Sequence, residues 1–265
     1  MPMKFMITND DGYEAPGLAA LFQALSQIGD VVVVAPLQCH SSRGHAVETK
    51  NRIRVETRRH DVMGNITVVH SSPADCVRVG LAHVLEEPPD VVVAGINPGA
   101  NLGVDLFYSG TAAAAREAAI MGTPAFALSR YFTDDRPVDW SALSAHVARV
   151  MKTMLADDYR LPQGHFWNVN FPAVQNDAYP DEIHLTHHGV LSHEISFRTV
   201  EEHSDGAQTL LFSGEYSSRG KSGECDVSHV FDEKITATPV GLLCSAFEKF
   251  APATQVSLDD VNCVN

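Results

Sequence analysis

The sequence predicts an α/β fold: a Rossmann-like, doubly wound, mostly parallel sheet that carries a β-hairpin extension towards its C-terminus. The first observation is that short apolar runs alternate with amphipathic stretches over about 170 residues. The second is that these runs are rich in β-branched residues, which is typical of strands buried on both faces. The third is a change after residue 183, where short alternating stretches are separated by polar turns.

The first strand–helix–strand unit is predicted at the N-terminus. Residues 4–8 are expected to form a buried strand, and apolar residues at helical spacing follow it as far as Ile28. Pro16 lies near the start of this helix and Gly29 directly after its end, which is the usual asymmetry of helix termini. Residues 31–36, VVVVAP, are expected to form the second buried strand.

The rest of the α/β core is predicted in the same way. Ser72 is expected to be the N-cap of a helix that has Pro73 in its first turn and ends at about Leu85. The remaining predicted elements are a strand at 91–96, a helix at 111–121, a strand at 125–129, a helix at 140–155 and a strand at 166–171.

We expect one domain over residues 1–265. Its parts are an α/β core over about 1–175, a hairpin extension over about 183–240 and a C-terminal segment over 241–265. Alternating stretches at 195–200, 209–216 and 230–238 predict hairpins that extend from the core, and 241–250 is predicted to be a short helix.

Composition and charge exclude several classes of protein. The net charge of −14 would repel nucleic acid and anionic membranes. No apolar stretch approaches the roughly 18 residues needed to span a membrane, and there is no signal-peptide pattern. The five cysteines form no C-x-x-C pair, which argues against a zinc knuckle or a disulfide framework. We therefore expect a cytoplasmic protein with no nucleic-acid polymer or membrane as partner.

Polar residues follow three of the predicted strands. Asp10 and Asp11 end the first strand, a polar loop (CHSSRGH, 39–45) follows the second, and Asn97 and Asn101 follow the strand at 91–96. The carboxyl ends of parallel strands meet in one crevice, where open α/β sheets bind ligands. Carboxylate, hydroxyl and amide oxygens suit a hard divalent cation. The alternative is that the two aspartates cap the helix that follows them.

A second candidate site lies where the loop after residue 97 enters the alanine-rich helix. Ser109, Gly110 and Thr111 place two hydroxyls and backbone N–H groups at a helix N-terminus, which predicts a phosphate cradle. The alternative is an ordinary serine or threonine N-cap. Neither the G-x-S-x-G elbow of serine hydrolases nor a G-x-G-x-x-G dinucleotide motif after the first strand is present.

At these residues the sequence resembles the SurE family of metal-dependent 5'/3'-nucleotidases. The resemblance runs in order along nearly the whole chain. Its blocks are NDDGYEAPGL (9–18), VVVVAP (31–36), SPADCVRVGL (72–81), the long block over 89–129, WNVNFP (167–172) and CDVSHVFDEKITATPV (225–240).

The resemblance implies a function and an assembly. It implies hydrolysis of nucleoside 5'- and 3'-monophosphates to nucleoside and phosphate, with short polyphosphate as a further substrate of some members. It also implies a SurE-like fold whose hairpin extension mediates a homodimer or homotetramer.

The resemblance also implies site residues. It implies one divalent ion per subunit (Mg, Mn or Co) held by Asp10, Asp11, Ser41 and Asn97, with Asp10, Asp11 and Asn97 in the catalytic set. It implies phosphate binding by Ser109, Gly110 and Thr111, and we expect Asn101 to add a hydrogen bond. Direct hydrolysis is expected, because the sequence holds no D-x-D-x-T pattern for a phosphoenzyme. The resemblance implies that Asp10 rather than Asp11 orients or deprotonates the water.

The chain departs from the family pattern at several positions. Leu37 replaces an aspartate and Ser42 a glycine, so that Ser42 competes with Ser41 as a metal ligand. Pro98 replaces the histidine of the GINHG motif, and residues 186–189 read THHG. Two other interpretations stay open here: a non-catalytic nucleotide- or anion-binding module on the same fold, and a glycosyltransferase that uses the aspartate pair to hold a metal–nucleotide diphosphate.

Overall fold

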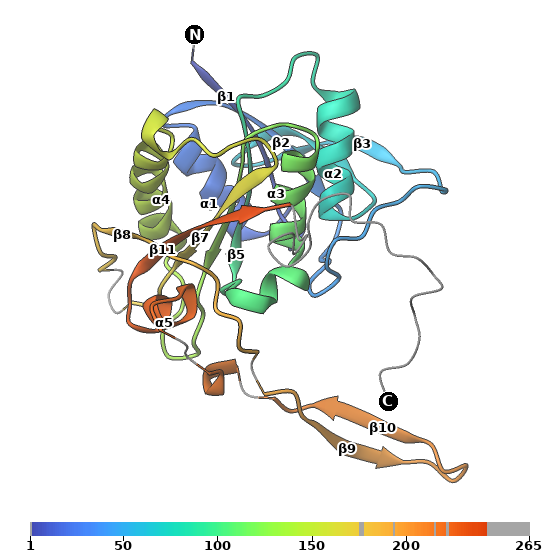
Figure 1. Cartoon of the computed structure of the whole chain (residues 1–265). Coiled ribbons are helices and arrows are strands. Elements are labelled where there is room, and N and C mark those ends of the chain that lie inside the picture. The colour runs from blue at the N-terminus through green and yellow to red at the C-terminus, as the bar shows by residue number, and fades with distance from the viewer. Residues whose placement is uncertain (1, 175–177, 193, 215, 221–222, 243–265) are drawn as a thin grey trace, which may run out of the picture.

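The computed structural model describes residues 2–242 apart from 175–177, 193, 215 and 221–222 (Figure 1). The described residues form a nine-stranded sheet and a separate two-stranded hairpin. The order in the sheet is β3-β4-β2-β1-β5-β6-β7-β11-β8. Its strands are β1 (Met3–Thr8), β2 (Gly29–Pro36), β3 (Val55–His60), β4 (Gly64–Val69), β5 (Val91–Pro98), β6 (Ala125–Arg130), β7 (His165–Phe171), β8 (Ile183–Leu185) and β11 (Ile235–Gly241).

Five α-helices are present in the described part of the chain. They are α1 (Pro16–Leu25), α2 (Pro73–Val79), α3 (Gly110–Ile120), α4 (Trp140–Met154) and α5 (Asp226–Phe231). The helix expected to end at about Leu85 is α-helical as far as Val79 and continues as a π-helical turn over Gly80–Val84. No helix among the described residues is long and apolar enough to cross a membrane.

The sheet is doubly wound, as the sequence predicts. β1 is an interior strand and pairs in parallel with β2 on one side and β5 on the other. The chain extends the sheet from β2 to β4 in one direction and from β5 through β6 to β7 in the other. The point at which the strand order reverses therefore lies between β1 and β5, and ligands of open α/β sheets bind at the carboxyl ends there.

Helices cover both faces of the sheet. α1 and α4 pack against each other and against one apolar face, and α2 and α3 do the same on the other. The interior strands can be apolar on both faces because each face is covered. The alanine-rich sequence of α3 keeps its side chains short, and its small residues Ala112, Ala114, Ala115 and Ala118 are all fully buried against the sheet.

The segment at 230–238 differs from the prediction. Val230 belongs to α5, and β11 joins the main sheet antiparallel to β7, with Ile235 and Ala237 buried in the core. An alternating pattern predicts a half-buried strand but does not reveal which strand it pairs with. The antiparallel pair β3–β4 at the sheet edge also forms, although no strand was predicted there. The helix predicted at 241–250 lies almost wholly outside the described residues.

The other two predicted stretches do form a hairpin. β9 (Phe197–Glu202) and β10 (Gln208–Phe212) pair antiparallel, and Figure 1 shows them projecting away from the body of the protein. All residues of both strands are exposed, including Phe197, Leu210, Leu211 and Phe212. A two-stranded hairpin without a packed face is marginally stable in water, so a covering surface would stabilise it.

Candidate metal and phosphate site

The turn after β1 fixes the direction of the aspartate pair. Asn9 is buried and its side-chain amide donates to Gly12 O at 2.8 Å, which closes the turn. Tyr13 N donates to Pro36 O at 2.9 Å and holds the far side of the turn against the end of β2. Asp10 and Asp11 therefore lie at the switch point of the sheet, at its carboxyl edge.

Asp10 points to the N-terminus of α3. The Thr111 hydroxyl donates to Asp10 Oδ1 at 2.6 Å. A Cβ atom at Gly110 would lie 2.7 Å from Asp10 Oδ2, so the close approach requires glycine there. Burial raises the pKa of Asp10, and the hydrogen bonds from the Thr111 hydroxyl and the Gly110 backbone oppose this without cancelling it.

Asp11 has a buried carboxylate oxygen to which no described residue donates. Its Oδ2 atom is buried and has no hydrogen-bond partner among the described residues. Burial, and then the neighbouring charge of Asp10, raise the pKa of Asp11 to about 7. A buried carboxylate oxygen without a donor is costly unless another group satisfies it. This unsatisfied oxygen and the adjoining carboxylate fit a cation.

The third strand end contributes Asn97. Its side-chain N–H donates to Gly99 O at 2.6 Å, and this orientation leaves the amide carbonyl oxygen as an acceptor. Asn97 lies at the end of β5, beside the strand that delivers the aspartates. The structure therefore brings Asn97 to the same edge of the sheet as Asp10 and Asp11.

The loop after β2 brings the two serines to this edge, but at the surface. His40 N donates to Asp10 O at 2.7 Å, which ties the loop to the aspartate turn. Ser41 and Ser42 are exposed, and the Ser41 hydroxyl lies 2.9 Å from Cys39 Sγ. In the part of the chain that the structure describes, no hydrogen bond joins either serine to the aspartates.

The predicted phosphate residues have partners within the protein. Ser109 is the N-cap of α3 and accepts from Ala112 N at 3.0 Å, and the Thr111 hydroxyl is engaged by Asp10. Asn101 is buried, and its side-chain N–H donates to Ser129 Oγ at 2.8 Å. The N-cap alternative thus describes Ser109, and phosphate binding by these residues stays a prediction.

The aspartates do not cap the helix that follows them. The N-cap of α1 is Ala15, which makes no side-chain hydrogen bond. Asp10 instead faces the N-terminus of α3, a helix that begins 100 residues later in the sequence. An anion is stabilised at such a terminus whichever segment supplies it.

Sequence reasoning gave no role to His40, which lies near Asp10, or to Arg43, which lies near His40. Burial, and then the charge of Arg43, lower the pKa of His40. The charge of Asp10 acts in the opposite direction but does not cancel this. Both residues stand in the polar loop singled out from the sequence, but the path of the loop decides which of its side chains approaches Asp10.

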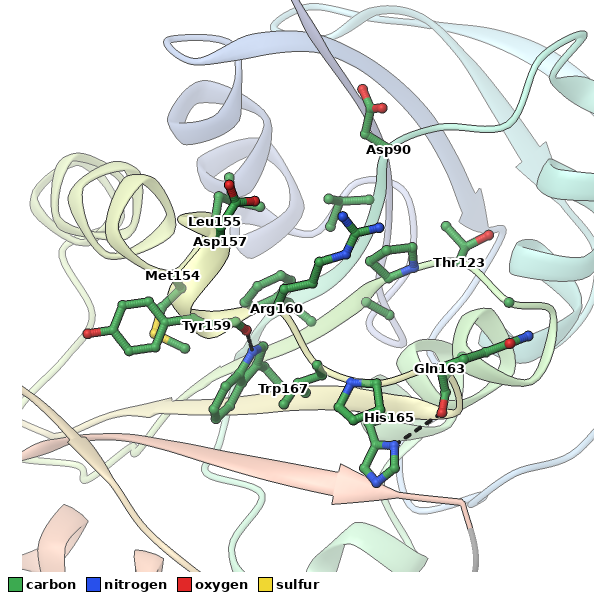
Figure 2. Close-up of a pocket in the computed structure, with 18 of the residues that line it drawn as sticks. Asp90, Thr123, Met154, Leu155, Asp157, Tyr159, Arg160, Gln163, His165 and Trp167 are labelled. Atoms are coloured by element: carbon green, nitrogen blue, oxygen red, sulfur yellow. Dashed lines mark hydrogen bonds between the residues drawn. The ribbon is translucent and has the colours of Figure 1, made fainter.

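A cavity of about 550 Å³ lies at the opposite edge of the sheet (Figure 2). Its lining includes the first residues of four strands, Met3, Val91, Ala125 and His165. Figure 2 shows Trp167 donating to Tyr159 O, a bond of 2.9 Å, on its floor. Arg160, Asp90 and Asp157 give its lining charges of both signs, and none of the predicted site residues reaches it.

Comparison with known proteins decides the family. The family model described as "Survival protein SurE" matches residues 5–194. This chain belongs to the SurE family. A relative from Synechocystis sp. is 39% identical over 89% of this chain and 98% of its own length. The "5'-nucleotidase SurE" of Geobacter sulfurreducens is 43% identical over 64% of this chain and 62% of its own length.

A solved structure agrees with the fold of this SurE family member. The crystal structure of the SurE protein from Aquifex aeolicus superposes with a TM-score of 0.78 at 28% sequence identity. The match covers 93% of this chain and 96% of that chain. The doubly wound fold predicted from the sequence is thereby confirmed.

Proposed function

We propose that this chain is a divalent-metal-dependent 5'-nucleotidase, which hydrolyses nucleoside 5'-monophosphates to nucleoside and phosphate. The observation that carries the proposal is the buried Asp11 oxygen to which none of the described residues donates, beside Asp10 at the switch point of the sheet. Relatives named 5'-nucleotidase SurE support the reaction class.

The donor set fits a hard cation. Asp10, Asp11, Ser41 and Asn97 would hold it, and all four offer oxygen, which suits Mg²⁺, Mn²⁺ or Co²⁺ better than a soft metal. A bound divalent cation supplies Lewis acidity towards the phosphoryl oxygens and lowers the pKa of a coordinated water.

The chain's own residues orient the reactants. Asp10 is the residue that would accept the proton of the attacking water, because Thr111 and Gly110 fix its carboxylate in one orientation. The Asn97 side-chain N–H is engaged by Gly99 O, so its carbonyl oxygen is the atom that would bind the cation. The N-terminus of α3 gives this edge a positive potential, which favours a phosphate group.

The proposal includes finer points. They are action on 3'-monophosphates and short polyphosphate, one divalent ion per subunit, a cytoplasmic location, and a homodimer or homotetramer formed through the β9–β10 hairpin. The exposed apolar residues of that hairpin support the last point. The division into a core over about 1–175, an extension over about 183–240 and a C-terminal segment over 241–265 belongs to the same proposal, although β8 and β11 at the two ends of that extension pair within the main sheet.

The alternative of a non-catalytic nucleotide-binding module has no observation in its favour. It predicts metal and nucleotide binding without release of phosphate from any monoester. A glycosyltransferase would instead turn over a sugar nucleotide.

The test is a phosphate-release assay on nucleoside 5'- and 3'-monophosphates with Mn²⁺, Mg²⁺, Co²⁺ or excess chelator. We expect turnover of 5'-monophosphates with at least one of these ions and none in chelator. Undiminished turnover in chelator would overturn the metal dependence. Absence of phosphate release with every ion would overturn the nucleotidase proposal.

A further inference from the structure

The site loop, residues 98–109, joins the proposed metal ligand Asn97 to α3. One end of the loop follows Asn97, and the other is Ser109, the N-cap of α3. The middle of the loop is bound by side chains more than a hundred residues away in the sequence. Three residues of the C-terminal third hold it, and we call them the C-terminal clamp: Tyr216, Arg219 and Asp226.

Asp226 fixes the first half of the loop. It is fully buried at the start of α5, and its Oδ2 accepts from Gly103 N at 2.8 Å. Its Oδ1 accepts from Gly189 N and Val227 N, each at 2.8 Å. The site loop also lies close to the backbone at Gly189. A Cβ atom at Gly103 would lie 2.4 Å from Gly189 O, so this approach requires glycine at position 103.

Arg219 and Tyr216 bind both Asp105 and two backbone carbonyls that precede it in the loop. Arg219 Nη1 donates to Asp105 Oδ2 at 2.6 Å, and its Nη2 donates to Leu102 O at 3.1 Å. The Tyr216 hydroxyl lies 2.8 Å from the same Asp105 oxygen and 3.1 Å from Ala100 O. Arg219 and Asp105 are both buried, so this ion pair is screened little by water.

The clamp is connected to the proposed metal site by a continuous series of hydrogen bonds. The Asp105 backbone carbonyl accepts from Ser109 N at 2.9 Å, and Ser109 is the N-cap of α3. The first turn of α3 contains Gly110 and Thr111, which hold Asp10. A shift of Asp105 would therefore move the N-terminus of α3 against Asp10.

We propose that Arg219 and Asp226 are positioning residues for the metal site: they fix the site loop so that Asn97 and the N-terminus of α3 face the aspartate pair. The inference rests on the proposed function, because it assumes that Asp10, Asp11 and Asn97 bind a cation. Neither residue touches the reacting atoms. The hairpin β9–β10 leaves the body between Gly189 and Tyr216, so both of its ends lead to the clamp.

The test is Mn²⁺ binding by the full-length chain, measured by electron paramagnetic resonance, together with kcat and KM. The variants are Arg219→Met, which removes the bonds to Asp105 and Leu102 O, and Arg219→Lys, which keeps the charge. The matched control is Arg149→Met, which removes one positive charge as Arg219→Met does: Arg149 lies on α4, outside the site loop and the clamp, and donates to Asp181 Oδ1 at 2.7 Å.

We expect Arg219→Met and Asp226→Asn to weaken Mn²⁺ binding by about tenfold, a typical loss when outer partners of ligands are removed. Arg219→Lys should restore part of the loss, and Arg149→Met should leave the Mn²⁺ affinity unchanged. Wild-type affinity in folded Arg219→Met and Asp226→Asn, or an equal loss in Arg149→Met, would overturn the inference. A wild-type chain that binds no Mn²⁺ would instead contradict the proposed function on which it rests.

Discussion

Asp11 and Asp226 are both carboxylates removed from water, and the protein treats them in opposite ways. Asp226 accepts three backbone N–H groups and faces His188 at 3.1 Å. Burial alone would raise the pKa of Asp226, but the bonds from His188, Gly103 N and Gly189 N lower it overall. Asp11 has a buried oxygen without a described donor, and its pKa is raised to about 7.

The difference separates a structural carboxylate from a candidate ligand. A carboxylate that must stay charged in the resting protein is given enough donors to offset its desolvation. A carboxylate that binds a cation must keep its oxygens available, and the metal-free protein bears the cost of burying them. The predictions below test this contrast between the aspartate pair and the clamp, from the largest expected effect to the smallest.

Asp10→Asn should lower kcat for a nucleoside 5'-monophosphate by about 10³-fold or more, because it removes both a proposed ligand and the proposed proton acceptor. Steady-state kinetics with saturating Mn²⁺ measures this. Asp90→Asn, at the opposite edge of the sheet, is the control and should stay near wild-type activity. A folded Asp10→Asn variant with wild-type kcat would refute the assignment.

Gly110→Ala should lower kcat by about 10²-fold, since displacing a reacting group by about 1 Å has this effect. The added methyl group would lie 2.7 Å from Asp10 Oδ2, so Asp10 or α3 must move. Circular dichroism should show an intact fold, and kinetics the loss. Unchanged kinetics would mean that the contact between Asp10 and α3 does not orient the carboxylate.

The same substitution at the two carboxylates should change stability differently. In chelator at pH 8, Asp226→Asn should cost about 2 kcal/mol, because an amide N–H₂ would face backbone N–H groups that lose a charged acceptor. Asp11→Asn should cost nothing or stabilise the chain, because it removes a buried, unsatisfied charge. Urea unfolding measures both. Destabilisation of equal size in the two variants would contradict the proposed difference between the satisfied Asp226 and the unsatisfied Asp11.

The smallest expected effect is on the stability of the chain at acidic pH. The pKa of Asp226 is lower in the folded than in the unfolded chain, where it is about 3.9. Its contribution is therefore fully present above that unfolded value and is lost as the pH falls through the folded one. The difference in unfolding free energy between wild type and Asp226→Asn should be constant above about pH 5 and shrink below pH 4. A difference that grows on acidification would contradict the sign of the shift.

The sequence predicts most of the core and the members of the site, but few of their contacts. Runs such as VVVVAP predict interior strands because no other element buries so many β-branched residues in a row. The adjacent carboxylates predict a cation site only together with the polar loops that follow two other strands, since the pair alone could equally cap a helix. The hydrogen bond from the Thr111 hydroxyl to Asp10 depends on how α3 packs against the sheet. The sequence at the N-terminus of α3 does not predict that packing.

The clamp lay beyond sequence reasoning for the same physical cause. Asp226 and Gly103 are 123 positions apart, and nothing in either segment specifies the other. Likewise, the alternation in β11 predicted a strand, but its pairing with β7 is decided by the unfilled edge of the sheet. Local patterns predict elements, whereas contacts between distant segments follow from the packed whole.

The most direct test of the contrast is calorimetric titration of Mn²⁺ into the metal-free wild-type chain, Asp11→Asn and Asp226→Asn. We predict one ion per wild-type chain, no measurable binding by Asp11→Asn, and one more weakly bound ion in Asp226→Asn. Binding of Mn²⁺ by folded Asp11→Asn with wild-type affinity would contradict the account, because the unsatisfied Asp11 oxygen would then not belong to a cation site.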